Sequence, residues 1–87
     1  MINNSTIGYD LSIIPNPFKD YLLVQGNNLN KVNIEIFDGN GKLVRRIPSY
    51  QTQSKIKVND LISGIYWIRI TDESTGKSIT QKFIKKQ

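Results

Sequence analysis

Apolar and polar residues alternate along several short stretches of this chain. In the clearest stretch, Val32, Ile34 and Ile36 are separated by two polar residues, Asn33 and Glu35. Side chains at alternate positions of a strand point to the same side of the sheet. The pattern therefore predicts a strand with one buried face and one solvated face.

Seven such stretches are expected to be strands, spaced about ten residues apart as in small all-β domains. They span residues 11–14, 21–25, 32–36, 43–47, 56–58, 65–71 and 78–84. Turn-forming residues separate them, Pro48 is expected to end the fourth, and no stretch has helical periodicity. Short strands at regular spacing favour an antiparallel β-sandwich, because a five-stranded oligonucleotide-type barrel needs fewer and longer strands. We expect one all-β domain over residues 11–87, with residues 1–10 as a linker or frayed end.

Residue types in the turns predict local conformations. Asp38 and Gly41 bound a segment rich in residues that tolerate positive φ, as a tight hairpin requires. Gly64 is expected to occupy a conformation, or a close approach, that a Cβ atom forbids. Tyr66 should place its ring in the core and its hydroxyl beside a backbone group, as the corner tyrosine of sandwich domains does.

The segment Pro15-Asn16-Pro17 is expected to form a stiff bend between the first two strands. Each proline has a fixed φ and pushes the preceding residue toward an extended conformation. The residues before this segment lack the basic and then apolar layout of a signal peptide. If the natural protein is exported, we expect its signal peptide upstream of Met1.

The chain contains no cysteine and no histidine. Disulfides, thiolate metal sites and a cysteine nucleophile are therefore excluded, as are the commonest general base and zinc ligand. Asp38 and Asp60 are the nearest approach to the paired carboxylates of a glycoside hydrolase. Turn chemistry explains both residues without catalysis. We therefore expect no enzyme activity and no cofactor.

The net charge is +5, from 12 Lys and Arg residues against 7 Asp and Glu residues. Such a balance favours anionic partners, but outward lysines also keep a domain soluble and protect sheet edges. The basic residues gather at Lys42, Arg45 and Arg46, at Lys55 and Lys57, and at Lys82, Lys85 and Lys86. If these groups shared a face they would form a basic stripe. Aromatic residues do not interleave with them as a base-stacking surface requires, so nucleic-acid binding is not expected.

Tyr66 and Trp67 are neighbours, so their side chains point to opposite faces of one strand. An exposed Trp67 would favour stacking on a sugar ring. We expect a second sheet to bury it instead.

Three blocks of residues carry a more specific signal. They are Ile13-Ile14-Pro15-Asn16-Pro17-Phe18 with Asp20, Leu22 and Val24; the run from Val32 to Asp38 with Gly41, Lys42 and Val44; and the run from Asp60 to Tyr66 with Ile68, Arg69, Ile70 and the lysine-rich end from Gln81 to Lys86. In this order and spacing, the blocks closely resemble the type A C-terminal sorting domain of the type IX secretion system. The resemblance covers Leu11 to Lys86. It departs from many members at Ile14, where they carry tyrosine.

The resemblance implies an immunoglobulin-like sandwich that serves as a C-terminal secretion signal. Members of the family end large exported proteins of certain Gram-negative bacteria. After Sec export to the periplasm, an outer-membrane translocon recognises the domain, and a sortase-like protease typically removes it. The resemblance also implies that this protease can join the cargo to anionic lipopolysaccharide. The expected location is therefore the cell surface or the medium, and the expected partners are the translocon, the protease and a fused N-terminal cargo domain.

Residues in the last predicted strand are the candidates for direct recognition, through their side chains or by strand addition at an exposed edge. They are Lys82, Phe83, Ile84, Lys85 and Lys86. The other signature residues are expected to determine the fold first: Pro15, Asn16, Pro17, Asp38, Gly41, Gly64 and Tyr66. The alternative hypothesis is a carbohydrate-binding or adhesion-type sandwich module.

Overall fold

The computed structural model describes residues 11–15, 17–26 and 31–86. The strands are β1 (Leu11–Ile14), β2 (Tyr21–Gly26), β3 (Lys31–Asp38), β4 (Leu43–Gln51), β5 (Ile56–Lys57), β6 (Gly64–Asp72) and β7 (Ser78–Lys85). The predictions for residues 1–10 and for Asn16 fall outside the described residues. In the part that is described, no helix has the length and apolar character needed to cross a membrane.

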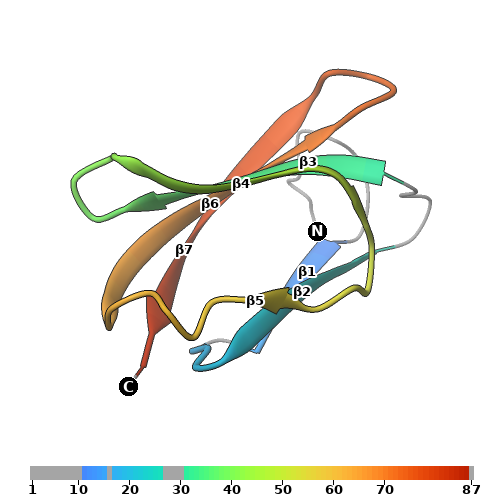
Figure 1. Cartoon of the computed structure of the whole chain (residues 1–87). Coiled ribbons are helices and arrows are strands. Elements are labelled where there is room, and N and C mark those ends of the chain that lie inside the picture. Colours follow the sequence, from blue (N-terminus) through green and yellow to red (C-terminus); the bar gives the residue numbers. More distant parts are fainter. Residues whose placement is uncertain (1–10, 16, 27–30, 87) are drawn as a thin grey trace.

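The strands form two antiparallel sheets that face each other (Figure 1). One sheet has the order β1-β2-β5, and the other has the order β4-β3-β6-β7. The predicted immunoglobulin-like β-sandwich of seven strands is therefore confirmed.

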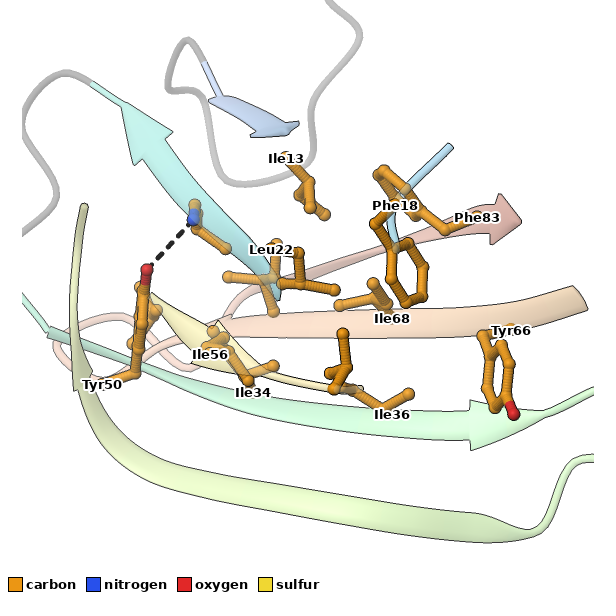
Figure 2. Packing of buried hydrophobic residues seen from close by; sticks show 14 residues of the cluster. Ile13, Phe18, Leu22, Ile34, Ile36, Tyr50, Ile56, Tyr66, Ile68 and Phe83 are labelled. Atoms are coloured by element: carbon orange, nitrogen blue, oxygen red, sulfur yellow. Dashed lines mark hydrogen bonds between the residues drawn. The ribbon is translucent and has the colours of Figure 1, made fainter. Parts of the chain in front are cut away.

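Alternate residues of the strands fill the space between the sheets (Figure 2). The buried apolar residues are Ile13, Phe18, Leu22, Val24, Val32, Ile34, Ile36, Tyr50, Ile56, Val58, Tyr66, Ile68, Ile70 and Phe83. Phe18 packs with the register partners Tyr66 and Phe83 at one end of the core, with its ring centroid 6.3 Å from that of Tyr66 and 6.5 Å from that of Phe83. Burial of this apolar surface is the main stabilising term for such a small domain.

The expectation that Pro48 ends the fourth strand is wrong, because β4 continues through it to Gln51. The pairing of β4 with β3 shifts register between Val32 and Ile34, so an irregularity in the ladder accommodates Pro48 and Ser49. Ser49 has a φ of 52°, and its N–H bonds to the side chain of Asn33 at 2.9 Å. β4 is an edge strand, where a proline that cannot donate a hydrogen bond is tolerated.

The extension of β4 places Tyr50 where β5 is too short to pair with β2. Val24 of β2 donates its N–H to the Tyr50 hydroxyl at 3.0 Å, a bond drawn in Figure 2. The C=O of Val24 accepts the N–H of Gln53 at 2.7 Å, and the Tyr50 hydroxyl donates to the C=O of Ser54. The Tyr50 side chain and the turn at Gln53 thus satisfy the backbone N–H and C=O of Val24, which lies beyond the end of β5.

The turns take the conformations that residue type predicted. The Asp38 carboxylate accepts the N–H of Asn40 at 2.9 Å and that of Lys42 at 3.0 Å, and Gly41 has a φ of +85°. Gly64 has a φ of +151°, and a Cβ atom there would meet no atom within 4 Å. Its conformation therefore favours glycine, and no close approach does.

At the start of β6, Tyr66 is buried and donates its hydroxyl to the C=O of Ile62 at 2.6 Å. This is the backbone partner expected for a corner tyrosine. Pro15 follows a cis peptide bond with Ile14, in the chain that connects β1 to β2.

Candidate recognition surface

The five candidate recognition residues in and after β7 separate into two groups. Phe83 is only 3% exposed and Lys85 only 4% exposed, because both point between the sheets. Lys82, Ile84 and Lys86 are exposed. A period of two along a strand has this consequence, since Phe83 and Lys85 lie on the same face.

The inward residues take part in the packing. Phe83 contacts the ring of Phe18, and the Lys85 ammonium donates to the C=O of Lys86 at 3.0 Å. The charge of Lys85 also acts on the Asp60 carboxylate. In the folded domain these two side chains are not available to a partner.

β7 is the second edge strand of the four-stranded sheet, opposite β4, and the chain around Phe18 covers only its end. The N–H of Phe18 donates to the C=O of Ile84 at 3.0 Å, and the N–H of Lys86 donates to the C=O of Phe18 at 2.7 Å. Because backbone groups alternate in direction, those of Thr80 and Lys82 point to the same side as Ile84, before the covered end. A strand-addition site would therefore lie along residues 80–82.

The outer face of the four-stranded sheet, the side turned away from the core, carries apolar side chains. Trp67 is 40% exposed there, so the expectation that a second sheet buries it is wrong. Its register partners are Phe37 on β3 and Lys82 on β7. The three-stranded sheet covers the opposite side, where Tyr66 points, and no described element covers the side of Trp67.

Four further apolar residues adjoin Trp67 on this face. Leu43 pairs with Phe37 across β4 and β3, and Ile65 pairs with Ile84 across β6 and β7. Leu43, Ile65 and Ile84 are each more than two-fifths exposed. Sequence reasoning missed this cluster, although apolar residues on both faces of the stretch 65–68 were a visible signal.

An ion cluster lies beside the aromatic residues. The Glu35 carboxylate accepts hydrogen bonds from Arg69 at 2.8 Å and from Arg46 at 3.3 Å. Arg69 foremost, and then Arg46, hold the pKa of Glu35 below its ordinary value, against an opposing effect of burial. The Arg69 guanidinium also lies 5.3 Å from the ring centroid of Phe37.

The predicted basic groups do not form one stripe. Arg46 belongs to the ion cluster on the outer face, whereas Arg45 reaches toward the other sheet and binds the Asp60 carboxylate at 2.7 Å and the C=O of Lys57 at 2.8 Å. Lys55 lies over the ring of Tyr21, with its ammonium 4.5 Å from the centroid. Of the three groups, the outward lysines of the C-terminal end and Arg46 lie on or beside the outer face.

Asp38 and Asp60 have separate structural partners. Asp38 binds the amides of its own hairpin, and the hydrogen bond from Arg45 is the main reason that the pKa of Asp60 is lowered. Both carboxylates are thus explained by local structure. Among the described residues, no three His, Cys, Asp or Glu side chains gather as a metal site would require.

Comparison with known proteins identifies the family of the chain and supports its fold. A family model described as a secretion system C-terminal sorting domain matches residues 12–86. No curated protein matches the chain. One similar solved structure is that of PorZ, described as an essential bacterial surface component of the type-IX secretion system of Porphyromonas gingivalis. The match has a TM-score of 0.66 and 22% identity, and it covers 93% of this chain but only 12% of the PorZ chain. At that identity the likeness supports the fold alone. The family match extends over nearly the whole sandwich, and the chain therefore belongs to the C-terminal sorting domains of the type IX secretion system.

Proposed function

We propose that this domain directs an attached cargo protein from the periplasm through the type IX outer-membrane translocon. The observation that carries the proposal is the family match over residues 12–86, which spans both sheets. The family consists of sorting signals and is not a class of enzymes. In this proposal the domain works by being recognised.

The outward side of β7 and the residue after it are the parts of the predicted site that a translocon can touch. Lys82 and Ile84 lie on the outer face, and Lys86 is exposed beyond the strand. Phe83 and Lys85 act indirectly, because they hold β7 against the core. Recognition therefore depends on three exposed side chains presented by a folded edge strand.

The cargo completes export at the cell surface or in the medium. A sortase-like protease then removes the domain, and the cargo is released or joined to anionic lipopolysaccharide. The domain itself needs no affinity for lipopolysaccharide or nucleic acid in this scheme. Its positive charge serves recognition and solubility.

The adhesion-type alternative has one observation in its favour, the exposed Trp67. A sugar-binding module would retain a glycan on a column and would not move a reporter across the outer membrane. The export experiment below separates the two functions.

The test is a fusion of all 87 residues to the C-terminus of a periplasmic reporter in a host with the type IX machinery. In that host, we expect the reporter at the cell surface or in the medium. In a strain without the translocon, we expect it to stay in the periplasm. A fusion that stays periplasmic in the competent host would refute the proposal.

The contribution of the lysines is tested with a double replacement of Lys82 and Lys86 by glutamine. The matched control replaces Lys55 and Lys57, which are exposed on the other sheet. We expect export to fall only in the first variant. Normal export of a folded Lys82→Gln/Lys86→Gln variant would show that these charges serve solubility alone.

A further inference from the structure

The outer face carries an apolar band that the fold does not explain. The band comprises Leu43, Phe37, Trp67, Ile65 and Ile84, which come from all four strands of the larger sheet. Directly opposed side chains on one face of a sheet have Cβ atoms about 5 Å apart, so the register makes these residues neighbours. Four of them are 40–48% exposed.

Contiguous apolar surface on a small domain usually marks an interaction site. A solvated sheet face is expected to be polar, as it is in the neighbouring row of Glu35, Arg69 and Thr80. On the smaller sheet, Ile14 and its register partner Leu23 lie beside Tyr21, but this group comes from only two strands and the Lys55 ammonium lies over the Tyr21 ring. The band is therefore a distinct surface feature.

A hollow of about 210 Å³ adjoins one end of the band, at Ile65. Its lining includes Ile62, which is 80% exposed, and two glycines, Gly39 of the hairpin between β3 and β4 and Gly64 at the start of β6. A central aromatic residue beside a hollow that accepts a partner's side chain is the usual anatomy of a protein interface.

The charges around the band are mostly positive, although Asp38 lines the hollow, where its carboxylate binds two amides of its own hairpin. Lys82 is the register partner of Trp67, and Lys42 precedes Leu43. Glu35 is the carboxylate of the neighbouring row, and two guanidinium groups already bind it. An occupant with carboxylates around an apolar centre would be complementary in both respects.

Three other occupants fit less well. A second copy of the chain would set lysines against lysines across the interface, which costs free energy. A bilayer requires side chains that penetrate its boundary region, whereas Trp67, Ile65 and Ile84 are each more than half covered by the sheet. A sugar-binding face uses aromatic rings with polar groups, whereas three of the five band residues are aliphatic.

We propose that the apolar band docks a protein component of the export machinery whose contact surface has an apolar centre and an acidic border. The inference rests on the proposed function, and it extends the recognition surface from β7 to the whole outer face. Lys82 and Ile84 then belong to one interface with Trp67 and Ile65.

The test replaces Trp67 and Ile65 together by threonine, which keeps a strand-forming residue at both positions. The matched control replaces Ile14 and Tyr21 by threonine as well; these residues are 40% and 36% exposed on the smaller sheet. Both variants are made in the 87-residue fusion, and urea denaturation of the purified domains checks that they fold. The amount of reporter at the cell surface should fall roughly tenfold or more in the band variant, because a central aromatic residue of the interface is lost. In the control variant it should stay within about twofold of the wild-type amount.

Export of a folded band variant at the wild-type level would overturn the docking proposal and leave the sorting function intact. A wild-type fusion that is not exported would overturn both. The acidic border is tested separately, since Lys82→Glu should reduce export and Lys82→Arg should preserve it. Equal export of these two variants would contradict an acidic partner.

Two measurements on the purified domain test the other occupants. Sedimentation equilibrium should show a monomer, and a dimer that the Trp67→Thr/Ile65→Thr variant dissociates would assign the band to a second copy. Co-sedimentation with vesicles of phosphatidylglycerol and phosphatidylethanolamine should show no dependence on Trp67. Binding that the variant loses would assign the band to lipid, and either result would overturn docking of a protein.

Discussion

Replacing Tyr50 by phenylalanine removes one oxygen atom and leaves the buried ring in place. That oxygen accepts the N–H of Val24 at 3.0 Å and donates to the C=O of Ser54. Val24 is fully buried on β2, and its N–H points to the side where β5 has already ended. The substitution therefore leaves a buried backbone donor without its partner.

The magnitude follows from the two bonds that are lost. A buried N–H left unsatisfied costs about 1–3 kcal/mol of folding free energy. Ser54 is exposed, so water replaces the hydroxyl at its C=O and the second loss adds little. We expect Tyr50→Phe to lower the free energy of unfolding by about 1–3 kcal/mol, almost all of it from Val24.

Tyr66 supplies a matched control within the same domain. Tyr66 and Tyr50 are 3% and 4% exposed, but the Tyr66 hydroxyl donates only to the C=O of Ile62, a residue 80% exposed. Water can serve that carbonyl in Tyr66→Phe, so the expected loss is about 0.5–1.5 kcal/mol. The difference between the two variants isolates the cost of the stranded amide.

Urea denaturation of both variants measures this difference, and thermal melting should follow at roughly 4–8 °C per kcal/mol for a domain of this size. Hydrogen exchange provides the local readout, because the Val24 amide should lose protection in Tyr50→Phe alone. Equal destabilisation by the two substitutions, with the Val24 amide still protected, would refute the reasoning.

Three further outcomes follow from individual contacts. Gly64→Val should destabilise by about 1–3 kcal/mol in thermal melts, because a φ of +151° disfavours a β-branched residue; an unchanged melting temperature would contradict this. The lowered pKa of Glu35 means that its stabilising effect is complete above the unfolded-state pKa and is lost as pH falls through the folded-state pKa. The stability advantage of wild type over Glu35→Gln should therefore shrink in urea titrations as pH falls from 7 toward about 3, and a constant difference would exclude this linkage. Lys85→Met should fold and be exported in the reporter assay, because the buried ammonium contacts the C=O of Lys86 within its own chain; a folded but unexported variant would assign Lys85 a direct role.

The strands and their inward residues were predictable because one face of each strand is buried and the other is solvated. Val32, Ile34 and Ile36 show that alternation, and all three are fully buried. Hairpin chemistry at Asp38 and the conformation of Gly64 depend on local geometry, which residue type alone indicates. These predictions needed no knowledge of how the sheets meet.

The contacts that sequence missed depend on long-range register. Tyr50 reaches Val24 because β4 continues past Pro48, and an irregular ladder of this kind leaves no simple pattern in the sequence. The exposure of Trp67 depends on which face of its sheet the second sheet covers. By contrast, the burial of Lys85 followed from the same period of two that places Phe83 in the core, and the basic character of the segment obscured it.

The two faces of β7 separate folding from recognition. A truncation that removes β7 also removes Phe83 from the core, so loss of export after truncation is explained equally well by unfolding. Outward substitutions at Lys82 or Ile84 change no core contact, and inward substitutions at Phe83 change no exposed surface. If the machinery reads the outer face, outward variants should lose export at unchanged stability, and inward variants should lose export only in proportion to unfolding. Export that follows the free energy of unfolding for both sets alike would mean that the translocon requires a folded sandwich and does not read the side chains of this face.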